Sequence, residues 1–166
     1  LWAKAMGGIG GEEGNSIATD EAGNVYITGY YNGTADFDPS AGTFNLTSAG
    51  EGDVFVVKID ASGNFLWAKT IGGSGNDWGI SIATDIAGNV YTTGHFFGTA
   101  DFDPGAGILN LTSAGNIDVF VSKLDASGNF LWAKAIGGTG SDIGFSIATD
   151  GAGNVYTTGY FNATAD

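Results

Sequence analysis

The sequence predicts an all-β protein built from tandem units, and three observations support this prediction. The 166 residues include 30 glycines and only two prolines, which suits short strands joined by tight turns. Charged residues make up 14% of the chain and aromatic residues 13%, a balance that favours strands over helices. The third observation is an internal repeat with a period of 65 residues.

The repeat is marked by the tetrapeptide Leu-Trp-Ala-Lys, which begins at Leu1, Leu66 and Leu131. The first two units are identical at 46 of 65 positions, and the third follows the same pattern to the end of the chain. The predicted organisation is one continuous array, a fragment of a larger one, with unit 1 at 1–65, unit 2 at 66–130 and partial unit 3 at 131–166.

Each unit is predicted to contain four strands, because large and small side chains alternate along it at a period of two. Residues 81–85 carry the small side chains expected of an innermost, crowded strand. The stretch from Thr99 to Gly115 is too long for a hairpin turn and is expected to add one or two short edge strands. In unit 2 the main strands are expected at residues 65–71, 79–85, 89–96 and 118–124.

Two connections in unit 2 share the pattern Asp-x-x-Gly-Asn, at residues 85–89 and 125–129. The Asp side chain can accept hydrogen bonds from backbone N–H groups two or three residues further on, and Gly supplies a positive φ. Such turns join antiparallel neighbours, so each unit is predicted to form a four-stranded meander.

A tandem four-stranded antiparallel sheet is typical of the blades of a β-propeller. The alternative is a parallel β-solenoid, in which each unit forms about three coils of roughly 20 residues. The predicted hairpin turns favour the propeller.

Three segments of unit 2, at residues 77–85, 88–94 and 118–125, resemble the bacterial SBBP β-propeller repeat. They read Asp-Trp-Gly-Ile-Ser-Ile-Ala-Thr-Asp, Gly-Asn-Val-Tyr-Thr-Thr-Gly and Asp-Val-Phe-Val-Ser-Lys-Leu-Asp. The resemblance covers most of each unit, with the insert at 99–115 less typical. Such repeats occur mainly in large exported or surface proteins, so the resemblance implies an extracellular or cell-surface location. It implies no reaction.

The net charge is −13, from 18 acidic and five basic side chains. This charge disfavours nucleic acid and anionic membranes as partners, because both are bound mainly through Lys and Arg. No apolar run approaches the ~20 residues of a membrane-spanning helix. The chain has no cysteine, which excludes disulfides and thiolate metal sites, and no signal peptide, so export signals are expected outside this fragment.

The repeat argues against catalysis, because an active site needs distinct residues in distinct roles. The only histidine, His95, stands where the other units have Tyr30 and Tyr160. We therefore interpret His95 as a packing or surface residue and expect His95→Tyr to preserve folding and any activity. The sequence also has no nucleophile elbow, His-Glu-x-x-His or phosphate loop. No enzyme activity and no cofactor are predicted.

Two acidic motifs are the best candidates for a Ca²⁺ site. Asp36 and Asp38 recur as Asp101 and Asp103 in the motif Asp-Phe-Asp-Pro. Paired carboxylates supply the oxygen ligands that Ca²⁺ needs, although Ca²⁺ requires six to eight of them. The competing and favoured interpretation is that these carboxylates hold a loop by accepting backbone hydrogen bonds.

Aromatic residues also recur at fixed points of each unit and could stack on sugars or pack between blades. Packing is the favoured interpretation, because large rings fill the space between neighbouring blades. The recurring residues are Trp2, Trp67 and Trp132, together with Tyr26, Tyr91 and Tyr156.

Two classes of function remain open: a non-catalytic secreted or cell-surface structural or adhesive module, and a propeller that binds carbohydrate or protein at a loop or axial site. A binding site should concentrate the differences between units, whereas a scaffold should scatter them. The first two units differ mainly at positions 5–6, 9–15, 30–32, 43–44 and 51–52. Several of these positions lie in turns, which indicates loop presentation on a constant scaffold.

The partners expected from the repeat itself are further units of the same chain or copies of it. Two full units cannot close a ring of about four to eight blades. The isolated chain is therefore expected not to be a stable closed monomer and to order only within a larger array or filament.

Overall fold

The computed structural model describes residues 1–165, which form thirteen strands and no helix. None of these residues therefore belongs to a helix long and apolar enough to cross a bilayer. The strands are β1 (Gly7–Gly8), β2 (Glu12–Thr19), β3 (Val25–Tyr31), β4 (Thr34–Asp36), β5 (Asn45–Thr47), β6 (Asp53–Ile59), β7 (Phe65–Gly73), β8 (Trp78–Thr84), β9 (Val90–Asp101), β10 (Asn110–Leu124), β11 (Phe130–Ile136), β12 (Ile143–Thr149) and β13 (Val155–Tyr160). The prediction of an all-β chain is confirmed.

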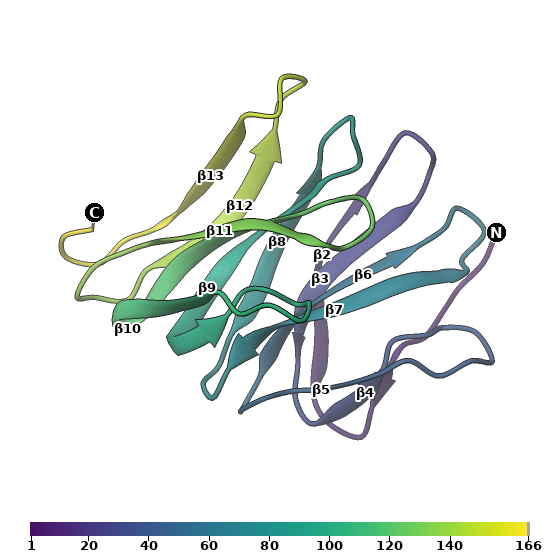
Figure 1. Ribbon diagram of the computed structural model, residues 1–166, viewed down its shortest axis with the longest axis horizontal. Helices are drawn as coiled ribbons and strands as arrows, with labels where there is room; N and C mark the ends of the chain where they lie inside the picture. The colour runs from purple at the N-terminus through teal and green to yellow at the C-terminus, as the bar shows by residue number, and fades with distance from the viewer. Residues whose placement is uncertain (166) are drawn as a thin grey trace.

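The strands form two complete four-stranded antiparallel meanders and part of a third (Figure 1). The first blade is β2-β3-β6-β7, the second is β8-β9-β10-β11, and β12-β13 begin the third. The predicted four-stranded, blade-like repeat is confirmed. All ladders between the described strands are antiparallel, which a parallel β-solenoid would not show.

The blade and the sequence unit do not share their boundaries. The Leu-Trp-Ala-Lys segment opens each sequence unit, but in β7 it is the outermost strand of the preceding blade, paired with β6. Each blade thus takes its last strand from the next sequence unit, which links consecutive units through backbone hydrogen bonds.

The insert at 99–115 adds no separate short strand and instead lengthens β9 and β10, whereas the equivalent segment of the first unit forms the expected short strands. In the first unit β4 and β5 form a separate hairpin beside β1. In the second unit β9 and β10 continue through the insert, with an irregular register between Thr112 and Ile117. The end of β7 pairs with this extension through Gly72 and Gly73, so the insert ties the first blade to the second.

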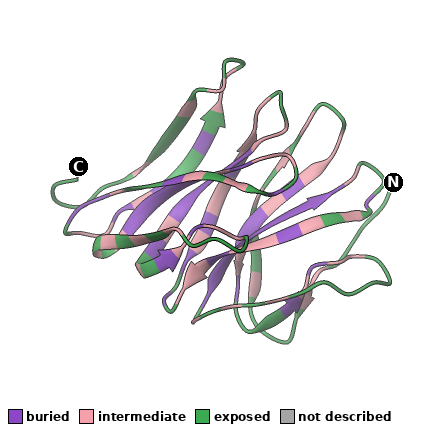
Figure 2. Ribbon diagram, viewed as in Figure 1, coloured by how far each residue is buried: buried purple, intermediate pink, exposed green. Residues whose placement is uncertain are grey.

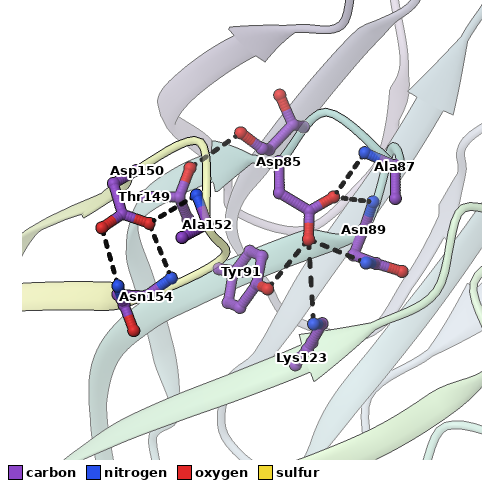
Figure 3. Close-up of polar contacts among 10 residues, drawn as sticks. Asp85, Ala87, Asn89, Tyr91, Lys123, Thr149, Asp150, Ala152 and Asn154 are labelled. Atoms are coloured by element: carbon purple, nitrogen blue, oxygen red, sulfur yellow. Dashed lines mark hydrogen bonds and ion pairs between the residues drawn. The ribbon is translucent and has the colours of Figure 1, made fainter.

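In the Asp-x-x-Gly-Asn turns the Asp side chain accepts from backbone N–H groups as predicted, but the donors lie two and four residues on rather than two or three (Figure 3). Asp85 Oδ1 accepts from the N–H groups of Ala87 and Asn89, both at 2.9 Å, and Gly88 has a φ of +75°. Asp85 Oδ2 accepts from the Tyr91 hydroxyl at 2.9 Å and lies 3.7 Å from Lys123 Nζ. Burial alone raises the pKa of Asp85, but the hydrogen bonds outweigh it and lower the pKa overall.

We expect Asp85→Ala to lower the free energy of unfolding by about 2 kcal/mol, because the turn, the Tyr91 hydroxyl and Lys123 all lose a partner. Asp60→Ala is the matched control. Asp60 makes the same turn hydrogen bonds to Ser62 and Asn64, but among residues 1–165 no tyrosine or lysine bonds to it, so a smaller loss is expected. Urea denaturation of both variants provides the measurement. Equal losses would show that the contacts to Tyr91 and Lys123 contribute nothing.

The blades stack through their innermost strands, β2, β8 and β12. Thr84 Oγ1 donates to Thr19 O at 3.1 Å, and Thr149 Oγ1 donates to Thr84 O at 2.9 Å. The blades approach so closely that a Cβ on Gly79 would overlap Thr28 Oγ1 of the first blade. The small side chains of β8 therefore allow the close approach of innermost strands that the sequence predicts.

The recurring aromatic residues are part of the packing, and buried positions concentrate in β3, β6, β9 and β10 (Figure 2). Within the first blade Trp67 meets Tyr26 edge to face at 6.2 Å, and within the second blade Trp132 meets Tyr91 in the same way at 6.3 Å. Tyr26 also packs in one buried cluster with Ile82 and Val90 of the second blade. Trp67 Nε1 also donates to Ala126 O of the second blade at 3.3 Å. These contacts support packing over sugar stacking for the tryptophan series.

Candidate ligand-binding cavity

A cavity of about 340 Å³ lies where the first blade meets the second. It is lined by Glu51, Ser74, Gly75, Asn76, Trp78, His95, Phe97 and Ile117. Trp78 opens β8, His95 and Phe97 belong to β9, Ile117 belongs to β10, and Glu51 precedes β6. The remaining lining residues come from the segment that crosses from β7 to β8.

The crossing segment is fixed by backbone bonds and by Asp77. Asp77 N donates to Gly52 O at 2.8 Å, which holds the segment against the start of β6. The Asp77 carboxylate accepts from Gly73 N at 2.8 Å and from Phe97 N at 3.0 Å. Asp77 is 1% exposed, and this burial raises its pKa to about 6 despite the two hydrogen bonds. Asp77 thus joins both walls of the cavity.

Three aromatic rings form a row beside the cavity. Tyr30 of the first blade stacks on Trp78 with ring centroids 4.3 Å apart and an interplanar angle of 5°. His95 lies near Trp78, with centroids 5.4 Å apart. Trp78 therefore contacts two other rings, while Phe97 is 46% exposed.

The polar groups of the cavity are only partly paired. Asn76 Nδ2 donates to Glu51 Oε2 at 2.7 Å. Trp78 Nε1 and His95 Nδ1 are buried and find no hydrogen-bond partner among residues 1–165. Burial lowers the pKa of His95, so the ring is neutral at neutral pH. The cavity thus offers a free N–H donor and no cationic side chain among its lining residues.

Most of the lining residues lie at positions where the units differ. Seven of the eight change between units, and only Gly75 recurs, as Gly10 and Gly140. Trp78, for example, corresponds to Glu13 and Ile143. Among the polar residues, Glu51 corresponds to Asn116, Ser74 to Ile9 and Thr139, and Asn76 to Gly11 and Ser141. His95 corresponds to Tyr30 and Tyr160, Phe97 to Asn32 and Asn162, and Ile117 to Gly52.

The proposed acidic sites hold loops. Asp101 Oδ1 accepts from Asp103 N at 3.0 Å and from Leu109 N at 2.9 Å. Asp36 Oδ1 binds the N–H groups of Asp38 and Phe44 in the same way. Among residues 1–165, no three acidic or histidine side chains are grouped so that they could hold a metal ion. These contacts favour the loop-holding role, and Ca²⁺ binding stays a prediction.

Sequence reasoning treated His95 as a packing or surface residue and did not identify Trp78, Asn76 or Phe97 as site residues. The structure places His95 half-buried against Trp78, in the wall of the cavity. The sequence feature that could have identified the cavity is the group of differences between units at positions 9–15, 30–32 and 51–52. The fold brings residues from these positions and their equivalents together at the cavity.

The chain is similar in sequence to parts of two larger proteins. A 184-residue alignment with the "Uncharacterized WD repeat-containing protein L264" of Acanthamoeba polyphaga mimivirus is 29% identical, covering 97% of this chain and 13% of that protein. The "Regulatory protein FlaEY" of Caulobacter vibrioides is 32% identical over 110 residues, which is 66% of this chain and 12% of that protein. The chain thus spans only a small part of each relative.

A solved structure of a protein of unknown function from Bacteroides caccae is a distant likeness. It aligns with a TM-score of 0.33 and 15% identity over 89% of this chain and 53% of that one. The family model of the SBBP β-propeller repeat matches residues 7–38, 66–95 and 131–163, more than half of the sequence. This chain belongs to the SBBP β-propeller repeat family.

Proposed function

We propose that this chain is a non-catalytic binding module of an extracellular or cell-surface protein, in which constant blades present a variable cavity to a ligand. The observation that carries the proposal is the variation between units. Seven of the eight cavity residues change, whereas the turn, tryptophan and tyrosine contacts that hold the blades recur. A scaffold without a ligand has no reason to vary nearly every residue of one cavity.

The cavity chemistry supports binding more than catalysis. A general base has to reach the proton that it abstracts and must have a suitable pKa. His95 is neutral, enclosed against Trp78 and replaced by tyrosine at the equivalent positions. Glu51 is bonded to Asn76, and the cavity has no hydroxyl nucleophile paired with a histidine. We therefore propose no reaction.

The family and the repeat support the proposed partners. The mimivirus relative is named as a WD repeat-containing protein and the Caulobacter relative as a regulatory protein. Repeat arrays that bury a continuous core commonly serve as interaction scaffolds. We propose an adhesive role on an extracellular surface, with further units of the chain or copies of it as structural partners.

A purely structural array is the second candidate, and a specific observation favours it. The hydrogen bonds between innermost strands repeat with the same geometry at both blade junctions, as in Thr84 to Thr19 and Thr149 to Thr84. Such uniform junctions suit a long, rigid assembly. In that case the cavity would bind nothing, and the two candidates can be separated by experiment.

The test exchanges cavity residues for those that other units carry. The variant combines Glu51→Asn, Trp78→Ile and Phe97→Asn, and its control is Ile86→Glu, which installs the residue found at Glu21 in an exposed turn. After sedimentation has established the assembly state, both proteins are screened against immobilised glycans and peptides. We expect saturable binding that the triple exchange abolishes and the control retains. Binding that survives the triple exchange, or none at all, would favour the structural array.

A further inference from the structure

We propose that the cavity lined by Trp78, His95 and Phe97 binds a neutral carbohydrate, an inference that rests on the binding function proposed above. The sugar ring would pack on Phe97, and its hydroxyls would bond to the polar groups around Trp78. Four properties of the cavity support this assignment: its exposed ring, its mixed donors and acceptors, its volume and its charge.

Phe97 supplies the apolar surface. It is 46% exposed although it lies at the cavity wall and next to the fully buried Phe96. The face of an aromatic ring carries partial negative charge and attracts the polarised C–H groups of a sugar ring. The equivalent positions hold Asn32 and Asn162, so this ring is particular to the junction between the first and second blades.

The polar groups form a mixed set that hydroxyls can satisfy. Trp78 Nε1 is a donor without a partner, and His95 Nδ1 is likewise unpaired among residues 1–165. Glu51 provides carboxylate oxygens, and Asn76 retains its carbonyl oxygen because its amide group is the donor to Glu51. A hydroxyl both donates and accepts, so one sugar can serve the donors and the acceptors together. The cavity of about 340 Å³ is within the range of small-molecule sites.

The charge of the site argues against an anionic ligand. The lining residues include Glu51 and no Lys or Arg, His95 is neutral, and the whole chain carries a net charge of −13. A sialylated or sulfated glycan would meet repulsion from Glu51 with no cation to offset it.

A cationic ligand is the closest competitor, because Glu51 and aromatic rings also suit an ammonium group. Two observations weigh against it. Tyr30 stacks on one face of Trp78, the ring that would attract a cation most strongly, and so covers that face. An ammonium group also cannot accept the hydrogen of Trp78 Nε1, which a hydroxyl can.

The experiment follows the indole N–H resonances of the four tryptophans by ¹⁵N NMR during titration. Trp78→Ile, which installs the residue found at Ile143, identifies the Trp78 signal by its loss. The probes are neutral oligosaccharides of glucose, galactose, mannose and N-acetylglucosamine, with a sialylated oligosaccharide and tetramethylammonium as comparisons. We expect at least one neutral oligosaccharide to shift the Trp78 signal in a saturable manner and to leave the other three unchanged.

Phe97→Asn is expected to weaken that binding about tenfold, because the stacking surface is lost. Ile86→Glu should leave it unchanged, and circular dichroism confirms that each variant keeps its strands. The carbohydrate assignment is overturned if no neutral oligosaccharide shifts the Trp78 signal, or if Phe97→Asn binds as well as the parent chain. A shift with tetramethylammonium or a peptide alone would overturn the assignment but retain the binding function, whereas no response to any probe would overturn both.

Discussion

Replacing Phe102 by alanine is expected to lower the free energy of unfolding by about 3–5 kcal/mol. Phe102 is 0% exposed and lies between two other buried rings. Its ring centroid is 5.3 Å from that of Phe96, at an interplanar angle of 86°, and 5.2 Å from that of Phe120. Truncation would remove both aromatic contacts and leave a cavity that the surrounding strands cannot fill.

The measurement is the urea midpoint, with the slope of the unfolding transition as a check that the native state is still folded. Phe97→Ala is the control, because Phe97 lies in the same strand as Phe96 but is 46% exposed, and less than about 1 kcal/mol is expected from it. Phe37→Ala should repeat the large loss, since Phe37 is the equivalent residue of unit 1 and is also buried against aromatic rings. A loss below about 1 kcal/mol for Phe102→Ala would contradict this arrangement of the core.

The Asp-Phe-Asp-Pro motif shows where sequence reasoning succeeded and where it stopped. The spacing of Asp101 and Asp103 indicated either a cation site or a loop held by carboxylates. The hydrogen bonds favour the second, because Asp101 Oδ1 is occupied by two backbone N–H groups. The sequence analysis made no prediction for Phe102, which lies between them. Its burial shows that the loop is anchored to the core through this side chain.

Local features were the predictable ones. The Asp-x-x-Gly-Asn turns depend on atoms within five residues, so the pattern at 85–89 could be read directly from the sequence. The strands followed from alternation and from repetition at 65 residues. The blade boundary did not follow, because the assignment of β7 to the preceding blade depends on its pairing with β6 rather than on its own composition.

The cavity could not be predicted from the sequence, because it too depends on how distant strands pair. Its walls come from a residue shortly before β6, the crossing segment, the first residue of β8 and the middle of β9 and β10, which only the packing of two blades brings together. The differences between units were visible as separate clusters at positions 9–15, 30–32 and 51–52. Whether such distant groups of positions meet in space depends on the register of the strands, and the sequence pattern does not determine that register.

The stability of the chain is expected to rise as the pH falls from 7 to about 5, because of Asp77. Burial raises the pKa of Asp77 to about 6, and the nearby carboxylate of Asp53 adds to the effect. The unfolded chain has the ordinary value of 3.8, so the folded state binds the proton more tightly between these values. The contribution reaches about 3 kcal/mol once Asp77 is fully protonated in both states, and about 1 kcal/mol of it appears between pH 7 and pH 5.

Other ionisable side chains also change the stability between pH 7 and pH 4. The pKa of Asp53 is also raised by burial, so Asp53 acts in the same direction. The turn aspartates have lowered pKa values, so their contribution is complete above about pH 4 and is lost below it. His95 opposes Asp77, because a histidine with a lowered pKa destabilises the folded state as the pH falls below about 6.5.

The measurement is therefore made in the His95→Tyr background, which removes the opposing group and installs the residue found at Tyr30 and Tyr160. In this background the urea midpoint is expected to be higher at pH 5 than at pH 7, with an unchanged slope. Adding Asp77→Asn should lower stability at both pH values, because an amide nitrogen would face the N–H of Gly73 or Phe97. It should also flatten the pH dependence between 7 and 5. A midpoint that stays constant or falls in the His95→Tyr chain would mean that Asp77 is ionised in the fold at pH 5, and that the junction between the two blades is wetter than its burial indicates.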